Sequence, residues 1–268
     1  MTLQDWTSPD DLPLLAVGIS QQTQYRPPFT DALAGRTLAL VDAEGTERTC
    51  AFADAHHVEI TMAGQAVSAT YDATVVRDDI YLVDIVIEGP YRYEAVAGLP
   101  LEQTWALDLA AGTVTSTTSF VRERPDGSRW VRSVDEHLWL ADAPHRVPHQ
   151  RSTGMVGKRV LWQYSDTDRY DHIYMNAHNF AWQCVSGVEE GLTELDRTRT
   201  YEVAPDLFFF GWSEHVQPVE SMLFVDLANM KTFGRMYGWE HRTGEILHHQ
   251  FGAHGVLLNT TEYPDVIG

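Results

Sequence analysis

The residues best able to carry out chemistry lie in the second half of the chain, on segments that alternate like β-strands. Glu214 ends a run in which residues 208, 210 and 212 are large aromatics, and Arg197 and Arg199 share one face of the preceding run. A charge buried alone is costly, so an arginine and a glutamate facing one interior must pair, bind a ligand or shift in pKa. We therefore predict Glu214 as an acid or base and Arg199 as part of an anion clamp. The alternative is that Glu214 lies at a strand end in solvent.

Aromatic and imidazole side chains occupy the alternating positions of the neighbouring runs. Tyr164 is expected to complete the catalytic set by holding an anionic group together with Arg199. The predicted substrate-binding residues are Trp162, His172, Tyr174, Trp182, Trp212 and His254. The alternative is a packed core in which the tyrosine hydroxyls find backbone partners.

The sequence contains no recognisable cofactor or metal signature. Its 12 histidines do not follow a zinc-ligand spacing. It also has no glycine-rich phosphate loop, no dinucleotide fingerprint and no Gly-x-Ser-x-Gly elbow. We predict that the protein uses no metal and no cofactor.

Charge and cysteine content restrict the partners and the compartment. The formal net charge of -19 opposes binding to nucleic acid or to an anionic membrane. Cys50 and Cys184 are the only cysteines, and no export signal or membrane-length apolar run is present. The expected location is the cytoplasm, and a homodimer is one option for an oligomeric state that the sequence leaves open.

An internal repeat sets the expected fold. Two pairs of segments match at the same separation along the chain, and two further pairs match at other separations because the loops between them differ in length. The pairs are Gly35-Arg36 with Gly157-Lys158, Phe52–His56 with Tyr174–His178, Asp79–Leu82 with Asp206–Phe209, and Trp105–Ala110 with Leu223–Ala228. Both halves read as short alternating strands separated by turn residues, without a long amphipathic helix.

A meandering sheet has two unpaired edges, and closing into a barrel removes them. The sequence thus predicts an all-β protein of two tandem antiparallel barrels of lipocalin-like, or calycin, type. The expected parts are an N-terminal arm over residues 1–30, a first barrel over 31–142 and a second over 154–268. A linker rich in proline and histidine covers about residues 141–153. The second barrel, richer in Trp, Tyr, His and Arg, is the expected site of ligand binding.

Several short motifs of the chain resemble the MoaF family, that is, molybdenum cofactor biosynthesis protein F-like proteins. The segment from Gly35 to Thr118 resembles the family's N-terminal region. The motifs that resemble its C-terminal region are Asp171–Asn176, Phe180–Cys184, Gly191-Leu192, Asp226-Leu227, Met230–Thr232, Gly252–His254 and Leu257–Asn259. These motifs cover nearly the whole chain after about residue 30, and none of them is a catalytic signature.

A more distant resemblance is to the phenolic acid decarboxylases, lipocalin-like barrels that act without a cofactor. Gly211-Trp212-Ser213-Glu214 resembles their catalytic strand, which implies that Glu214 is the acid. Tyr164 matches one of their two carboxylate-binding tyrosines, whereas Trp162 replaces the other and so lacks that hydroxyl donor. Arg197 and Arg199 are both candidates for the family's arginine.

Two functions follow from these features. The first is a cofactor-independent acid–base enzyme, a lyase or isomerase that decarboxylates, hydrates or cyclises a small, partly apolar, anionic molecule in the second barrel. The second is a carrier that binds a small molecule, linked to molybdenum cofactor or aromatic metabolism, without changing it. A structural or protein-interaction module is the third reading, favoured if side chains fill both barrels.

Overall fold

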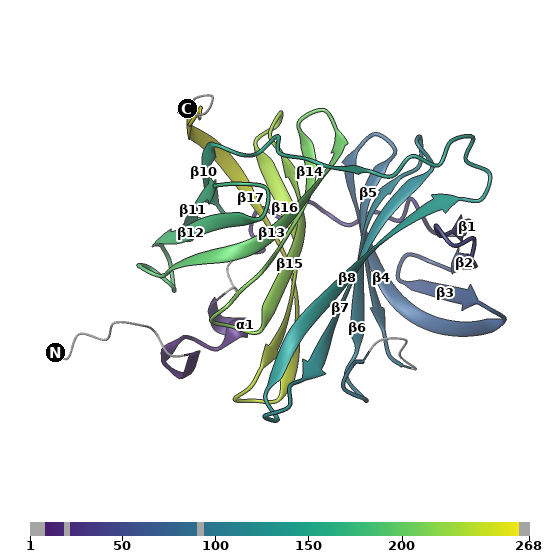
Figure 1. The fold of residues 1–268 in the computed structure, drawn as a ribbon, viewed down its shortest axis with the longest axis horizontal. Coiled ribbons are helices and arrows are strands. Elements are labelled where there is room, and N and C mark those ends of the chain that lie inside the picture. Colours follow the sequence, from purple (N-terminus) through teal and green to yellow (C-terminus); the bar gives the residue numbers. More distant parts are fainter. Residues whose placement is uncertain (1–8, 19–21, 90–93, 263–268) are drawn as a thin grey trace, which may run out of the picture. The chain divides into compact units, whose positions relative to one another are not determined.

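The computed structural model describes residues 9–18, 22–89 and 94–262. The chain divides into two compact units, Pro27–Gln150 and the combination of Met1–Arg26 with Arg151–Gly268. Each unit is built around one β-barrel (Figure 1). The predicted all-β fold with two tandem antiparallel barrels is confirmed.

The first barrel is a closed meander in which each strand pairs with the next and β1 pairs with β8. Closure runs through Leu40 opposite Leu140 and Val41 opposite Trp139. The strands are β1 (Thr37–Val41), β2 (Glu47–Phe52), β3 (His57–Met62), β4 (Gln65–Arg77), β5 (Ile80–Ile87), β6 (Leu101–Asp108), β7 (Thr113–Glu123) and β8 (Arg129–Leu140). Closure leaves no free sheet edge among these strands.

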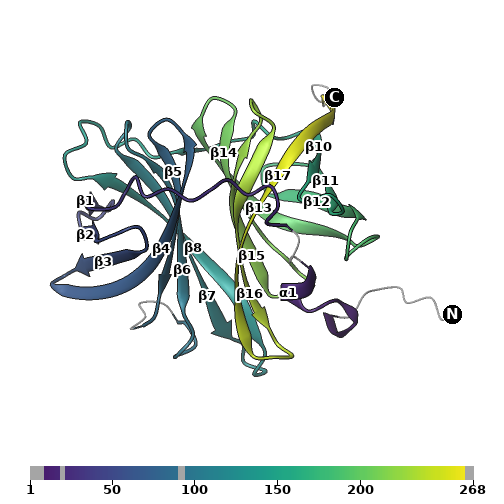
Figure 2. The same ribbon diagram turned by 180° about the vertical axis from the view of Figure 1, so that it is seen from behind.

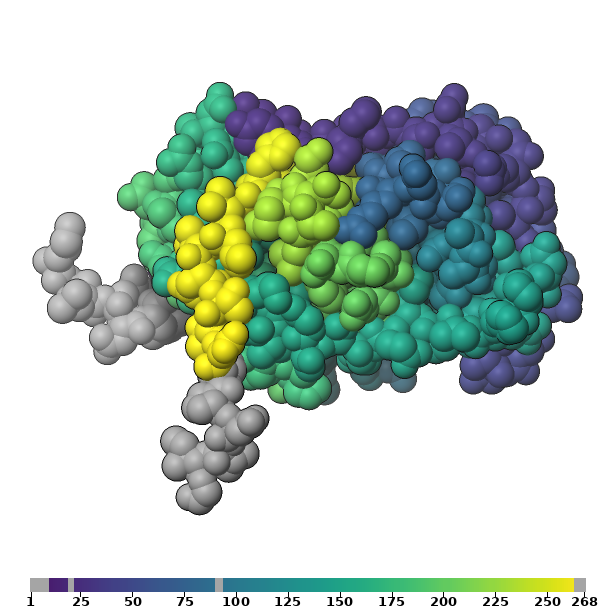
Figure 3. Space-filling view, turned by 90° about the horizontal axis from the view of Figure 1, so that it is seen from above, coloured from purple at the N-terminus to yellow at the C-terminus, as the bar shows by residue number. Residues whose placement is uncertain are grey.

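The second barrel is also a closed meander, with β12 pairing β13 and β17 pairing β10. Its strands are β10 (Lys158–Gln163), β11 (Arg169–Tyr174), β12 (Asn179–Ser186), β13 (Thr193–Ala204), β14 (Leu207–Ser213), β15 (Val219–Asp226), β16 (Lys231–Glu240) and β17 (Glu245–Thr260). The short β9 (Gln150–Arg151) adds to β13. The long last strand lies at the surface (yellow in Figure 3).

Matching hydrogen bonds underlie the sequence repeat. The amide of Gly35 donates to Phe52 O at 2.7 Å, and the amide of Gly157 donates to Tyr174 O at 2.8 Å. The amide of Leu109 donates to Asp79 O and that of Leu227 to Asp206 O, both at 2.9 Å. Asp79 and Asp206 also share a positive φ, 59° and 55°. The repeated sequence segments therefore make the same turns in both barrels.

The two interiors differ in what fills them. The buried cluster of the first barrel is mostly aliphatic, around residues such as Leu40, Val83 and Leu138. The cluster of the second is mostly aromatic and includes Trp162, Phe180 and Phe210. Its rings pack edge to face, as Phe180 and Phe210 do at 5.2 Å between centroids. The barrel that the sequence predicted as the site of ligand binding is therefore the one with the aromatic interior.

Helical structure is limited to two short segments of the N-terminal arm, η1 (Pro9–Asp11) and α1 (Leu15–Gly18), within the described part of the chain. Both segments belong to the second unit, and α1 lies beside its last strands (Figure 2). Within residues 9–18, 22–89 and 94–262, no helix is long and apolar enough to cross a membrane. Residues 1–8 and 19–21 of the predicted arm lie outside the described residues.

The repeat offers a matched pair of glycine substitutions. Gly35 and Gly157 have φ of +75° and +84°, a conformation that costs an L-residue about 1–2 kcal/mol. A Cβ on Gly35 meets nothing within 4 Å, whereas a Cβ on Gly157 would lie 2.2 Å from Thr261 O. We expect Gly157→Ala to lower the free energy of unfolding more than Gly35→Ala, as measured by urea denaturation. Equal losses would show that residue 261 moves away at no cost.

Candidate functional site

A cavity of about 350 Å³ opens into the second barrel. Its lining combines aromatic rings, carboxyl groups and aliphatic side chains from the barrel, its loops and the N-terminal arm. The lining residues are Leu12, Leu15, Gln22, Tyr164, Tyr170, His172, Trp182, Glu189, Gly191, Leu192, Thr193, Glu194, Trp212, Glu214, Val216, Gln217, Val219, Met236 and Leu247. A volume of this size accommodates a small ligand.

Five of the nine predicted site residues line this cavity, namely Tyr164, His172, Trp182, Trp212 and Glu214. They come from strands and from the ends of strands, and the closed barrel brings them together. The rings are in contact: the centroids of His172 and Trp212 are 6.1 Å apart. The aromatic wall predicted from strand alternation is therefore present around Glu214.

The other four predicted residues lie elsewhere. Trp162 and Tyr174 are buried in the aromatic core, where the Trp162 indole N–H donates to the Tyr174 hydroxyl at 3.3 Å. His254 is exposed and packs against Tyr25, with ring centroids 5.0 Å apart. Arg199 does not line the cavity.

The placement of Arg199 follows from the pairing register of β13. Thr198 is opposite Trp212, so it shares the inner face with that ring, whereas Arg199 is opposite Gly211 on the other face. There its guanidinium pairs with Glu220, whose side chain is 1% exposed. The anion clamp predicted from Arg199 does not form in the cavity.

Glu214 follows β14, and its carboxyl faces the cavity. This carboxyl accepts the Trp212 indole N–H at 3.4 Å. Burial, together with the negative charge of Asp196, Glu194 and Glu189, raises its pKa well above the ordinary value. The group therefore holds a proton at a pH where an exposed glutamate is ionised.

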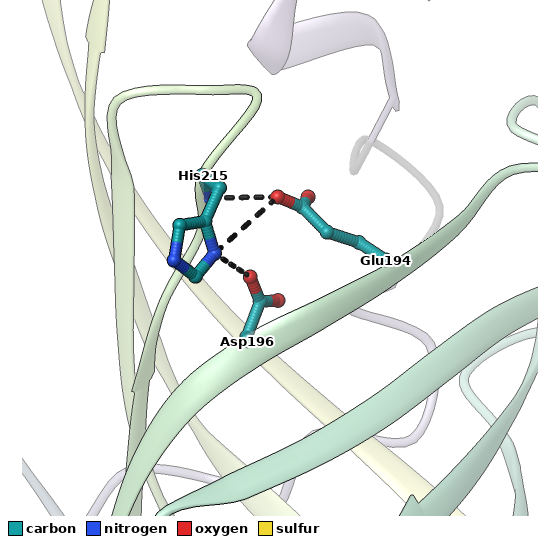
Figure 4. A group of neighbouring side chains, drawn as sticks. All are labelled: Glu194, Asp196 and His215. Atoms are coloured by element: carbon teal, nitrogen blue, oxygen red, sulfur yellow. Dashed lines mark hydrogen bonds and ion pairs between the residues drawn. The ribbon is translucent and has the colours of Figure 1, made fainter. Parts of the chain in front are cut away.

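Asp196 and Glu194 form a hydrogen-bonded network with His215 (Figure 4). Glu194 accepts the backbone N–H groups of His215 and Val216 at 2.6 and 2.8 Å. Asp196 accepts the Trp182 indole N–H at 2.8 Å, and the His215 ring lies 3.2 Å away. Burial, and then the charge of Glu194, raises the pKa of Asp196 to about 7. This network fixes the acids on β13 relative to the loop after β14.

The same three residues are the candidates for holding a metal ion. Their potential ligand atoms lie within 4.8 Å of one another. However, the two carboxylates already accept four protein donors: two backbone N–H groups, an indole and the His215 ring. These bonds hold the three residues together as a hydrogen-bonded cluster. The absence of a bound metal remains a prediction.

A second polar group lies at the cavity wall around Glu189. The Tyr170 hydroxyl donates to Glu189 at 2.7 Å, and the Gln22 amide lies 3.4 Å from the same hydroxyl. Burial raises the pKa of Glu189, although the bond from Tyr170 opposes this shift. Gln22 belongs to the N-terminal arm, so the arm contributes directly to the cavity.

His172 is the imidazole of the cavity. It is 4% exposed, and its Nδ1 has no hydrogen-bond partner among the described residues. Burial lowers its pKa to about 3, so the ring is neutral at physiological pH. It offers a ligand a hydrogen-bonding group without adding a positive charge.

The charge of the cavity differs from the sequence-based expectation. Among the described lining residues there are three glutamates and no lysine or arginine. Because like charges repel, such a wall disfavours a carboxylate or phosphate ligand. The expectation of an anionic ligand held by Arg199 is therefore not supported by the geometry.

The N-terminal arm covers one side of the cavity with Leu12 and Leu15. Arg242 donates to the carbonyls of Leu12 and Pro13 at 2.8 and 3.0 Å. Glu240 accepts the Leu15 amide at 3.1 Å. Hydrogen bonds from Arg242 hold the pKa of Glu240 at about 2, so this attachment remains ionised at neutral pH.

Comparisons with known proteins agree with the resemblance found in the sequence. The family model for the MoaF N-terminal domain matches residues 4–123, and that for the MoaF C-terminal domain matches residues 149–261. Protein MoaF of Klebsiella aerogenes is 38% identical over 211 residues, covering 77% of this chain and 80% of that protein. The chain belongs to the MoaF family. The name of this relative does not specify a reaction.

The chain is also similar to a solved structure, "Crystal Structure of a putative beta-lactamase from Burkholderia vietnamiensis". It is 15% identical, has a TM-score of 0.34, and covers 41% of this chain and 100% of its own. A match this weak says nothing about the site of the MoaF-family chain. The more distant resemblance to decarboxylases remains a prediction.

Sequence reasoning missed the acids that surround Glu214 in this MoaF-family chain. Glu194 and Asp196 lie on one face of β13, and Arg197 and Arg199 lie on the other. The sequence-based prediction has the arginine face pointing inward, so it does not identify the two acids. Glu189 and His215 lie on loops, where periodicity gives no signal. The Glu-x-Asp alternation was the available sign of the acidic face.

The raised pKa of Asp196 predicts a pH dependence of stability. A carboxyl whose pKa is higher in the folded state stabilises the fold below its unfolded value of about 3.9, and this contribution is lost as pH rises through about 7. We expect the free energy of unfolding of the second barrel to fall between about pH 4 and 7. Asp196→Asn should flatten this fall, as measured by urea unfolding followed through amide NMR signals of β13 and β14. An unchanged slope in the Asn variant would contradict the assignment.

The bonds from Arg242 predict how the arm is held. Arg242→Ala removes the donors to Leu12 and Pro13, each worth about 1 kcal/mol. We expect amide hydrogens of residues 9–18 to exchange about tenfold faster or more, while the barrel strands keep their protection. Arg197→Ala, on the outer face of β13, is the control. Equal exchange in both variants would show that other contacts hold the arm.

Proposed function

We propose that the second barrel binds a small, partly aromatic molecule and that Glu214 exchanges a proton with it. The reaction is of lyase or isomerase type and needs no cofactor. One observation carries the proposal: a carboxyl that faces the cavity has its pKa raised well above the ordinary value by burial and neighbouring acids. Such a group can donate a proton near neutral pH, where an ordinary glutamate has already lost it.

The neighbouring groups have separate roles in this proposal. Trp212 holds the Glu214 carboxyl through its indole N–H. Asp196, with a pKa of about 7, can exchange protons with its surroundings when Glu214 changes its charge. The neutral His172 supplies a hydrogen bond to the ligand, and the aromatic rings exclude water. Tyr164 and Tyr170 place two phenols at the same wall.

A carrier function is the second candidate, and one observation favours it. The polar groups on β13 are already paired within the protein: Glu194 with two backbone N–H groups, and Asp196 with Trp182 and His215. A site that only binds needs fixed polar groups and a matching shape, both of which this network supplies. The expected partner in either case is a small molecule. A cytoplasmic location remains a prediction from the two buried free thiols.

The enzyme proposal predicts that Glu214→Gln abolishes turnover while the protein stays folded. The amide keeps the shape of the side chain but cannot donate or accept a proton in catalysis. We expect a component of a small-molecule extract, followed by untargeted mass spectrometry, to be consumed by the wild type. Its consumption by the Gln variant should be at least about 100-fold slower, the lower range for general acid–base catalysis.

Glu190→Gln is the matched control, because this exposed glutamate is adjacent to Glu189 and does not line the cavity. It should consume the component at the wild-type rate. If the Gln variant at position 214 stays within about threefold of the wild type, Glu214 is not the acid or base. If the wild type returns its bound molecules unchanged, the carrier function is correct.

A further inference from the structure

We propose that the cavity of the second barrel binds a small molecule in which a short chain joins an aromatic ring to a protonated amine. The ammonium group would lie among the carboxyls of Glu189, Glu194 and Glu214. This inference names the ligand class for the proposed function and rests on the same cavity. It reverses the charge expected from the sequence. Four observations carry it: the unbalanced acids, the free acceptors, the aromatic wall and the size.

The acids of the cavity have no compensating cation among its described lining residues. Glu189, Glu194 and Glu214 line it, and Asp196 lies in the adjoining network. Within residues 9–18, 22–89 and 94–262, the lining contains no lysine or arginine. Buried carboxylates that lack a partner disfavour one another. An ammonium ion that enters this wall would offset part of that repulsion.

Three polar groups at the cavity wall have unused hydrogen-bonding capacity. Glu214 accepts one long bond, 3.4 Å from Trp212. Gln22 is 2% exposed, and its Oε1 has no hydrogen-bond partner in the described part of the chain. His172 Nδ1 is likewise without a partner there. An ammonium carries three donors and no acceptor, so it matches a wall that presents acceptors.

The rest of the lining indicates an aromatic ring on the ligand. Trp182 and Trp212 line the cavity, and indole rings attract cations as well as apolar rings. The aliphatic part includes Leu12, Leu15 and Leu247. With a volume of about 350 Å³, the cavity lies at the small end of ligand pockets, which favours one ring and a short chain.

Proton release distinguishes this inference from simple apolar binding. The groups that face one another here are Glu189, Glu194, Asp196, Glu214 and the rings of Tyr170, His172 and His215. Burial and the neighbouring acids raise the pKa values of Glu214 and Asp196, so these acids hold protons more tightly than exposed carboxyls do. An ammonium that enters should displace about one proton.

The experiment uses three probes that differ in charge: 2-phenylethylamine, 2-phenylethanol and 3-phenylpropionate. Isothermal titration calorimetry of the full chain at about pH 7 gives each affinity, and repeating it in two buffers of different ionisation enthalpy gives the protons released. We expect the amine to bind at least about tenfold more tightly than the alcohol, with about one proton released. The acid should not bind. Equal or tighter binding of the alcohol or the acid would overturn the inference.

Charge-removing variants locate the ammonium. Glu214→Gln should weaken amine binding at least about tenfold and leave alcohol binding unchanged, whereas the exposed control Glu190→Gln should change neither. Glu189→Gln provides the same test should the first variant fail to fold, as judged by near-ultraviolet circular dichroism. Unchanged amine affinity in both cavity variants would overturn the inference. So would stoichiometric binding of Zn²⁺ with no amine binding, since the acids would then hold a metal ion.

Failure of this inference differs from failure of the proposed function. If the amine does not bind but an extract component is consumed through Glu214, the ligand class is wrong and the acid–base function holds. If the amine binds with proton release and no component of the extract is consumed, the ligand class is right and the protein is a carrier of amines.

Discussion

Four carboxyl groups meet at one wall of the second barrel, and the other features of the site depend on how their charge is accommodated. The protein accommodates it in two ways. Donors from Trp182, Tyr170 and the backbone stabilise charge on three of the acids, and the raised pKa of Glu214 favours its neutral form. Neither way uses a cation from the described cavity lining. The site is therefore prepared for a proton or a positively charged group, because either one lowers the repulsion.

The first barrel buries charge in the opposite way. There the guanidinium of Arg48 makes two bonds to Glu136, at 2.9 and 2.6 Å, so the pair is balanced within the protein. The two barrels share their turns and their topology, but the acids of the second barrel's cavity have no such cation among the described lining residues. A duplicated fold can thus carry different side chains in each copy, since backbone hydrogen bonds specify the fold and side chains specify the site.

Much of the fold could be predicted because its signals are local. Alternation marks strands, Gly35 and Gly157 mark equivalent turns, and closure removes the edges of a meander. Glu214 could also be predicted, because it directly follows a run of alternating aromatic residues in the sequence. The attachment of the predicted N-terminal arm could not be predicted, because the bond from Arg242 joins residues far apart in the sequence and no periodicity marks that contact.

By itself, then, the sequence determined two all-β repeats, their family and an aromatic strand that ends in Glu214. Only the tertiary structure decided which face of β13 points inward. Alternation divides that strand into an arginine face and an acidic face, but a shift of one residue exchanges them. The pairing of Thr198 with Trp212 and of Arg199 with Gly211 makes the choice. It places Glu194 and Asp196 beside Glu214 and directs Arg199 to Glu220, so the register of one strand sets the charge of the cavity.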